Sequence, residues 1–159
     1  MSFEKLKSPD ELAGIAEQMG AAKRKLVFTN GCFDLLHVGH VRYLQQARAL
    51  GDALLVAVNG DASVRALKGP TRPVNAEHDR AEVLAALECV DYLVVFHSER
   101  VTDLVTQIRP HIYAKGGDYT VESLDAGERT ALQKIGTEIR ILPLVPGKST
   151  TSILAQCQS

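Results

Sequence analysis

The sequence predicts an α/β protein with a Rossmann-like, doubly wound parallel sheet of about five strands. Short runs rich in apolar residues alternate along the chain with amphipathic segments of helical length. One run, residues 53–58, is apolar throughout, which is typical of a strand that is covered on both faces. Glycine, proline and polar residues gather after these runs, where a strand would end and a loop would begin.

The first half of the chain is expected to contain strands at residues 25–29 and 53–58 and helices at residues 8–19, 38–50, 62–67 and 75–87. Ser8 and Glu11 form a capping-box pattern, with Pro9 at the first helical position. Gly51 would end the second helix, because glycine tolerates the left-handed conformation of the C′ position. A Gly-Pro loop separates the third helix from the fourth, and Asn75 is the expected N-cap of the fourth.

The second half is expected to contain strands at residues 91–96, 111–114 and 138–142 and helices at residues 101–108, 125–135 and about 150–156. Pro110 stops the first of these helices, because the residue before a proline disfavours the helical conformation. Ser149 or Thr150 would cap the last helix. Because strand and helix alternate throughout, right-handed crossovers would place helices on both faces of one parallel sheet.

The composition is that of an ordinary globular protein, and residues 1–159 are expected to form a single domain. The chain is 45% hydrophobic and 23% charged with a formal net charge of −1. Electrostatics therefore give no reason to expect nucleic acid or a membrane surface as a partner. No apolar run reaches the roughly 18 residues of a membrane span, and the amino terminus has no apolar signal core. The cysteines (Cys32, Cys89 and Cys157) match neither a disulfide framework nor a zinc pattern. A cytoplasmic location is expected.

Polar and glycine-rich clusters follow four of the expected strands, at residues 30–40, 59–61, 115–118 and 143–152. The carboxyl ends of parallel strands share one edge of the sheet, and ligands of open α/β sheets bind outside that edge. The four clusters therefore predict one common binding site.

His37, Gly39 and His40 lie in the first of these clusters, at an expected strand-to-helix turn. Positions three apart are neighbours on a helix, so both imidazoles can project from its first turn. Backbone N–H groups and the positive end of the helix dipole favour an anion there, which makes the turn a candidate phosphate site. Gly39 would let a ligand approach the backbone. Two other interpretations stay open: histidines without a function, and a metal site, for which no further histidine stands at ligand spacing.

Two motifs resemble the cytidylyltransferase-type nucleotidyltransferase superfamily, whose signature is HxGH near the amino terminus and a Ser/Thr-rich segment near the carboxyl terminus. They are Asn-Gly-Cys-Phe-Asp-Leu-Leu-His-Val-Gly-His at residues 30–40 and Gly-Lys-Ser-Thr-Thr-Ser at residues 147–152. The resemblance extends from Lys25 to Ala155. Within the superfamily, residues 58–61, 68–73, 115–119 and 147–152 are most similar to the adenylyltransferases that make ADP-heptose for the lipopolysaccharide core.

The resemblance implies an enzyme that transfers AMP from ATP to D-glycero-β-D-manno-heptose 1-phosphate and releases pyrophosphate. A Mg²⁺ ion would be bound mainly through the ATP phosphates, with no metal site made by the protein alone. Relatives of this kind are often fused to a sugar kinase. This sequence has no kinase half, so the stand-alone form, with a separate sugar kinase in the pathway, is expected, and the family suggests a homodimer.

The same resemblance implies roles for individual residues. The catalytic residues would be His37, His40 and Lys68. The nucleotide would be bound by Asn30, Gly31, Cys32, Phe33, His37, Gly39, His40, Lys115, Gly116, Gly117, Asp118, Lys148, Ser149, Thr150 and Thr151. The acceptor would be bound by Asp34, Asn59, Asp61, Lys68, Arg72 and Arg80. From residue type alone, Asp34 could instead stabilise a turn, Asp61 could cap a helix, and Arg80 could form a surface ion pair.

The late segment permits other interpretations. Residues 147–150 resemble the end of a P-loop, but Leu142 stands where the first glycine of that motif should be. Ser149 could be a helix cap and nothing more. Glycerol-3-phosphate cytidylyltransferases tend to carry an arginine in this segment, and residues 144–148 of this chain contain none. A cytidylyltransferase of that type, another adenylyltransferase and a non-catalytic nucleotide-binding module remain alternatives.

Overall fold

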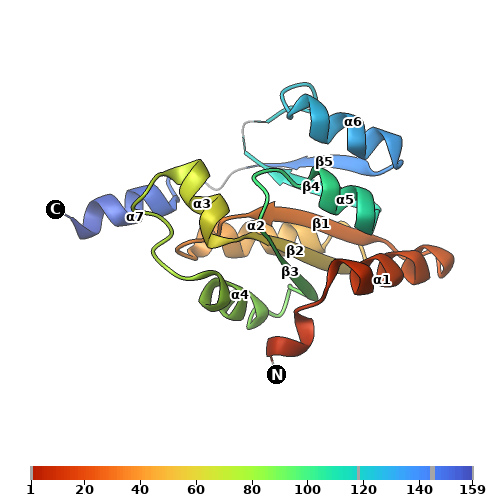
Figure 1. The fold of residues 1–159 in the computed structure, drawn as a ribbon, viewed down its shortest axis with the longest axis horizontal. Helices are drawn as coiled ribbons and strands as arrows, with labels where there is room; N and C mark the ends of the chain where they lie inside the picture. The colour runs from red at the N-terminus through yellow and green to blue at the C-terminus, as the bar shows by residue number, and fades with distance from the viewer. Residues whose placement is uncertain (1, 118, 144–145, 159) are drawn as a thin grey trace.

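The computed structural model describes residues 2–117, 119–143 and 146–158 of the chain. In these residues it contains five strands: β1 (Leu26–Gly31), β2 (Ala53–Asn59), β3 (Tyr92–Phe96), β4 (Ile112–Gly116) and β5 (Glu138–Leu142). All neighbouring strands are parallel, in the order β3-β2-β1-β4-β5 (Figure 1). The expected Rossmann-like parallel sheet of about five strands is confirmed.

The described residues also form seven α-helices: α1 (Pro9–Ala21), α2 (Val38–Arg48), α3 (Asp61–Lys68), α4 (Glu77–Ala85), α5 (Thr102–Ile108), α6 (Ala126–Lys134) and α7 (Thr150–Cys157). Every expected helix is present, and the Ser8–Glu11 capping box is closed in both directions. No sequence signal predicted the short 3₁₀ helix Ser2–Lys5.

Asn75 is not the N-cap of α4, so that expectation is wrong. The N-cap is Ala76, and no side chain caps the helix. Asn75 instead turns toward Asp34: its backbone N–H donates to the Asp34 carboxylate over 3.0 Å, and its side-chain amide donates to the Asp34 carbonyl over 2.9 Å. Asn75 therefore bonds the distant residue Asp34 instead of capping the helix that follows it.

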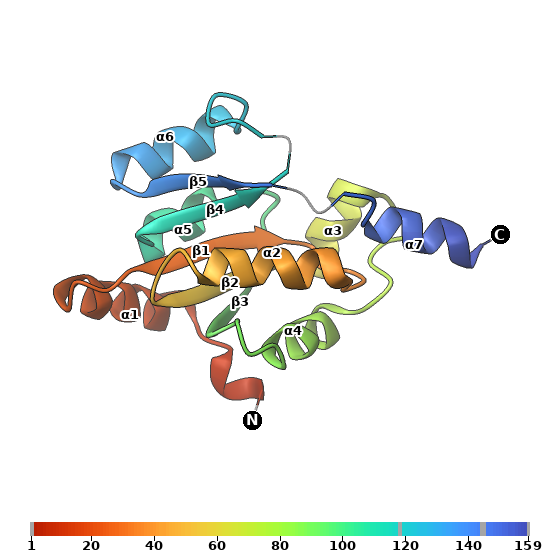
Figure 2. The same ribbon diagram turned by 180° about the vertical axis from the view of Figure 1, so that it is seen from behind.

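Helices cover both faces of the sheet, as the sequence predicts (Figures 1 and 2). On one face, buried side chains of α1, α5 and α6 pack against Phe28 and Tyr113 of the sheet. On the other face, α2 and α4 pack against Val27, Leu54 and Val56. All seven residues of β2 are buried, which explains its continuous apolar sequence. The last helix, α7, has no buried residue and projects from the end of the molecule.

The sheet opens between β1 and β4. Six residues of β1 are in register with β2, whereas within the described residues only Val27 and Phe28 are in register with β4. Beyond these pairs, side chains bridge the two strands. The Tyr43 hydroxyl of α2 lies 2.7 Å from Thr29 Oγ1 and donates to the Ala114 carbonyl over 3.0 Å. This opening is the point where the strand order reverses, and it faces the carboxyl edge.

None of the described helices has both the length and the apolar character that a membrane crossing requires.

Candidate active site

A cleft of about 590 Å³ lies at the carboxyl edge of the sheet. It is lined by most of the residues that the sequence singled out: Asn30, Gly31, Cys32, Phe33, Asp34, His37, Gly39, His40, Asn59, Lys68, Arg72, Lys115, Gly116, Lys148, Ser149, Thr150 and Thr151. The lining does not include Gly117, Asp61 or Arg80. Asp118 lies outside the described residues. The four polar clusters therefore do meet at one edge of the sheet, as expected.

His37 and His40 stack against each other at the start of α2. Their ring centroids are 3.9 Å apart, with 30° between the ring planes. His37 is the N-cap residue, and its Nδ1 accepts the Gly39 N–H over 3.1 Å. His40 is the N3 residue, and its Nδ1 accepts the His37 N–H over 3.3 Å. The pair forms a capping box in which imidazoles replace the usual serine and glutamate.

This capping box fixes the protonation of both rings. Burial, and then the repulsion that a second proton on neighbouring His37 would cause, lower the pKa of His40 to about 4. Burial, and then the positive charge of Lys148, lower the pKa of His37. Both rings are therefore neutral at pH 7, and because each Nδ1 accepts a backbone N–H, the ring proton is on Nε2. Each histidine offers the cleft an Nε2–H donor for a phosphate oxygen.

Gly39 is needed for this geometry in a way that the sequence did not predict. A Cβ at this position would lie 2.8 Å from Cε1 and 2.9 Å from Nδ1 of His37, and 3.1 Å from Cβ of Lys148. The glycine therefore leaves room for the His37 ring, in addition to any room that it leaves for a ligand. The Phe33 ring also contacts His40 edge-on, with 5.4 Å between the two ring centroids.

Asp34 and Arg72 form a nearly buried ion pair at the floor of the cleft. Arg72 Nε donates to Asp34 Oδ2 over 2.6 Å, and the backbone N–H of Val74 donates to the same carboxylate. Burial alone would raise the pKa of Asp34, but the N–H groups of Asn75 and Val74 together with Arg72 lower it below its usual value. Asp34 thus anchors the loop after α3 through residues distant in sequence, rather than its own turn as the alternative from residue type suggested.

Arg80 holds three chain segments together. The residue is 2% exposed, and its guanidinium donates to the backbone carbonyls of Asn75, Cys32 and Asn59 over 2.6–2.9 Å. It also pairs with the Asp61 carboxylate over 2.8 Å. Four of its five N–H donors are engaged in this way. Arg80 and Asp61 are thus partners of each other and neither lines the cleft, so their predicted contact with the acceptor stays a prediction.

The start of α7 is tied to the histidine loop. The Thr150 hydroxyl donates to the Leu35 carbonyl over 3.0 Å, and Ser149 Oγ accepts the Ser152 N–H over 3.0 Å. Ser149 is thus a helix cap, as one interpretation of the sequence had it, and it also lines the cleft. The adjacent Lys148 is close enough to His37 to lower the pKa of that ring.

The sequence interpretation missed five residues of the cleft, Tyr43, Leu67, Glu99, Arg100 and Glu128, and it gave no role to Tyr119 and Pro143, which lie in segments that it had singled out. Tyr43 has the spacing of an apolar residue on an amphipathic helix, yet its hydroxyl bridges β1 and β4. Burial raises its pKa to about 12, so it acts as a hydrogen-bonding phenol. Tyr119 receives the Lys115 ammonium at 4.9 Å from its ring centroid. Glu128 lies on a helix face with an ordinary amphipathic pattern, and nothing in the sequence marks it.

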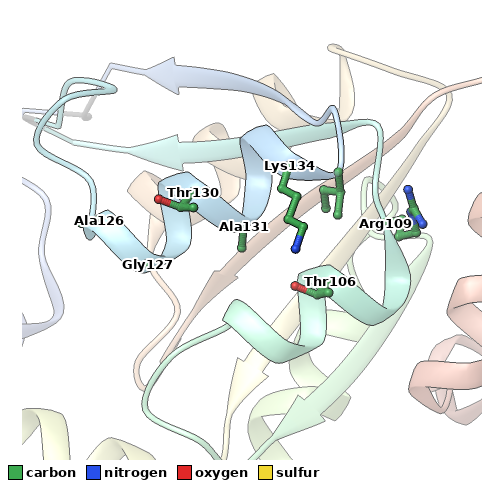
Figure 3. A pocket seen from close by; sticks show the side chains of 8 residues that line it. Thr106, Arg109, Ala126, Gly127, Thr130, Ala131 and Lys134 are labelled. Carbon is green, nitrogen blue, oxygen red and sulfur yellow. The ribbon is translucent and has the colours of Figure 1, made fainter.

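A second groove of about 680 Å³ runs between α5 and α6. Figure 3 shows Thr106 and Lys134 facing each other across it. Its other lining residues are Arg109, Ala126, Gly127, Thr130, Ala131 and Ile135. The groove contains no histidine and no carboxylate, and no residue of it was predicted to bind a ligand. The cleft at the sheet edge is therefore the better candidate, although it is the smaller of the two.

The described residues contain no group of three or more His, Cys, Asp or Glu side chains arranged to hold a metal ion. Asp34 also lines the cleft, and its carboxylate is bound to Arg72 and to two backbone N–H groups.

Comparison with known proteins gives one family model, two relatives and one solved structure. A family model described as cytidylyltransferase-like matches residues 28–154. The bifunctional protein HldE of Pelobacter propionicus is 49% identical over 153 residues, which cover 96% of this chain and 31% of that protein. The bifunctional protein HldE of Geobacter sulfurreducens is 47% identical over 150 residues, covering 94% of this chain and 30% of that protein.

A solved structure is also similar: the crystal structure of the lipopolysaccharide core biosynthesis protein from Thermoplasma volcanium. The TM-score is 0.64 at 28% sequence identity, and the match covers 77% of this chain and 97% of that one. The chain therefore spans about a third of the length of the curated relatives and nearly the whole of this solved structure.

Proposed function

This chain belongs to the cytidylyltransferase-like family, and on that premise we propose that it transfers AMP from ATP to D-glycero-β-D-manno-heptose 1-phosphate. The observation that carries the proposal is the neutral, stacked pair of His37 and His40 at the start of α2, with an Nε2–H donor on each ring. The choice of sugar rests on the resemblance to ADP-heptose-forming enzymes and on the relatives described above.

In the proposed reaction, an oxygen of the sugar 1-phosphate attacks the α-phosphorus of ATP in line. The new bond joins that oxygen to phosphorus, the bond between the α-phosphorus and the bridging oxygen breaks, and pyrophosphate leaves with the electron pair. No proton has to be removed from the nucleophile, because a phosphate monoester is already ionised at neutral pH. The chain therefore has to position the two substrates and to stabilise negative charge.

His37 and His40 would donate hydrogen bonds to the oxygens of the α-phosphate, where negative charge grows in the transition state. Neutral donors suit this role, because their hydrogen bonds are already oriented by the backbone and need no proton transfer. Lys148 stands next to His37, and Lys68 ends α3 at the rim of the cleft. These two ammonium groups would hold the β- and γ-phosphates and the departing pyrophosphate.

The N-terminus of α7 would add N–H donors for the same phosphates, since Ser149, Thr150 and Thr151 line the cleft there. A Mg²⁺ ion bound through the ATP phosphates supplies further charge neutralisation. On the other side of the cleft, Lys115 and Gly116 follow β4 and offer backbone and side-chain contacts to the nucleoside. We propose that the reaction takes place in the cytoplasm, with a sugar kinase supplying the acceptor, and we expect a homodimer from the family.

The test is a pyrophosphate-release assay that crosses ATP and CTP with heptose 1-phosphate and glycerol 3-phosphate. ATP with heptose 1-phosphate should be the fastest pair, by a factor of about 100 or more over the others. The His40→Ala variant should lose this activity, and His78→Ala, which changes an exposed histidine of α4, should keep it.

Two results would overturn the proposal. CTP with glycerol 3-phosphate as the fastest pair would identify a cytidylyltransferase. ATP binding without pyrophosphate from any acceptor would indicate a nucleotide-binding module without catalytic activity.

A further inference from the structure

Glu128 is a nearly buried residue of the cleft whose carboxylate has no partner among the residues that the structure describes. The residue is 5% exposed and lines the cleft from the first turn of α6. Its backbone N–H donates to the Asp125 side chain over 3.1 Å, but its own carboxylate makes no hydrogen bond or ion pair with any described residue. A buried carboxylate is normally paired or hydrogen-bonded, because its desolvation is costly.

The local sequence offers Glu128 a partner that it does not use. Asp125 is the N-cap of α6 and Glu128 is its N3 residue, which is the spacing of a capping box. In such a box the glutamate returns to the N-cap N–H, as Glu11 does to Ser8 over 2.8 Å in α1. In α6 only the Asp125 half of the box is formed. The Glu128 carboxylate is directed elsewhere.

The carboxylate oxygens of Glu128 are exposed to the cleft. Among the described residues, no fully buried side-chain oxygen or nitrogen lacks a hydrogen-bond partner. The unpaired Glu128 oxygens therefore belong to its small exposed fraction, and that fraction faces the cleft that the residue lines. A ligand donor or a water molecule is needed to complete the coordination of this carboxylate.

Next to the Glu128 carboxylate, which can accept a hydrogen bond, Tyr113 and Asn30 provide a group that can donate one. The Tyr113 hydroxyl donates to Asn30 Oδ1 over 3.0 Å, which turns the Asn30 NH₂ group to the remaining side. Burial, and then the negative charge of nearby Glu128, raise the pKa of Tyr113, so the phenol stays a donor. Asn30 also lines the cleft. Glu128 thus supplies an acceptor and Asn30 a donor at the place where β1 and β4 separate.

We propose that Glu128 and Asn30 bind a vicinal pair of hydroxyl groups on a substrate, with Glu128 accepting and Asn30 donating a hydrogen bond. Each hydroxyl of a diol both donates and accepts, so the two residues together match it, whereas a phosphate would be repelled by the carboxylate. The inference rests on the proposed function, in which both substrates carry vicinal hydroxyls: the ribose of ATP and the ring of the sugar 1-phosphate. The two sources are distinguished by experiment.

The experiment compares Glu128→Gln with the wild type and with Glu122→Gln, which changes an exposed glutamate of the loop before α6. Calorimetric titrations with one substrate at a time need no turnover and use ATP, 2′-deoxyATP, 3′-deoxyATP and heptose 1-phosphate. In Glu128→Gln the Kd of one substrate should rise by a factor of 10 to 100, and the Kd of the other should stay within a factor of two. Glu122→Gln should match the wild type.

The substrate that weakens identifies the source of the diol. If it is ATP, removing the hydroxyl that is bound should cost the wild type the same factor and should cost Glu128→Gln nothing more. If it is heptose 1-phosphate, the same comparison is made with its 2-deoxy analogue. The melting temperature separates binding from a structural role: Glu128→Gln removes an unpaired buried charge and should melt no lower than the wild type.

The inference is overturned if Glu128→Gln binds both substrates as the wild type does or if it melts several degrees lower. A change in the preference for ATP over ITP would assign Glu128 to the base, and a raised Mg²⁺ requirement would assign it to the metal. Either result also overturns it. A wild-type protein that binds heptose 1-phosphate but releases no pyrophosphate would refute the proposed function alone, and the titrations would still decide the role of Glu128.

Discussion

Replacing Gly39 with alanine should impair catalysis without unfolding the protein. The added Cβ would lie 2.8 Å from His37 Cε1, whereas ordinary contacts between such atoms begin near 3.4 Å, so the ring has to move by about 0.6 Å. That shift would stretch the Gly39 N–H to Nδ1 hydrogen bond, now 3.1 Å, and would displace the Nε2–H donor. A misplacement of about 1 Å can cost about 100-fold in rate, so a loss of 10- to 100-fold in kcat is expected.

The stability of Gly39→Ala should change little. The clash is with a side chain that can rotate, and alanine is favoured over glycine in a helix by up to about 1 kcal/mol. Gly14→Ala is the matched control, because Gly14 is also helical and a Cβ there would meet nothing within 4 Å. The assay is steady-state pyrophosphate release, with thermal melting of all three proteins.

Gly14→Ala should retain wild-type kcat and melt at the same or a slightly higher temperature. Wild-type kcat in Gly39→Ala, together with unchanged NMR shifts of the His37 ring, would refute the assigned role of this glycine. A fall in melting temperature as large as the fall in activity would also refute it, because the loss would then come from the fold.

Three further predictions concern charge and hydrogen bonding. His37→Ala and His40→Ala should each lower kcat by about 100- to 1000-fold with KM for ATP within about 3-fold, and a change in KM alone would contradict their role. Because the pKa of His40 falls from 6.5 to about 4 on folding, the unfolded chain binds more protons between these values. Stability should therefore fall as the pH is lowered from 6.5 to 4, and His40→Gln should flatten this dependence in thermal melts; an equally steep curve would argue against it. Arg80→Lys should lower the free energy of unfolding by about 3 kcal/mol in urea titrations, since one ammonium cannot replace four guanidinium hydrogen bonds. Arg42→Lys, on the exposed face of α2, is its control and should change little, and a similar effect of both would refute the structural role of Arg80.

The order of elements could be predicted because each is specified by its own residues. β2 is apolar at nearly every position, and α1 carries its capping box within four residues. The position of the cleft followed as well, since the carboxyl ends of parallel strands must share an edge. His37 and His40 were found for the same reason: their stacking depends on a spacing of three at a helix start.

Contacts between distant segments could not be predicted from spacing. The Asp34 carboxylate accepts hydrogen bonds from residues 72–75, about 40 positions away. Nothing in the sequence of either segment predicts this contact. Asn75 has the residue type of an N-cap, but the Asp34 carboxylate competes for it. Arg80 has the residue type of a phosphate ligand, yet it is used by backbone carbonyls and Asp61. Glu128 has the spacing of a capping-box glutamate, but its side chain does not accept the N–H of the N-cap residue Asp125.

The separation of β1 and β4 has a consequence for evolution. If backbone pairing between β1 and β4 continued past Phe28 and Tyr113, the sheet would gain hydrogen bonds and stability, but it would close the space in which we propose that the substrates bind. Selection for stability and selection for turnover therefore act in opposite directions on the same few residues. Stabilising substitutions in this protein should be sought at the other end of the sheet. Near Tyr43 and Asn30, a gain in stability from closer pairing of the strands would lower the activity.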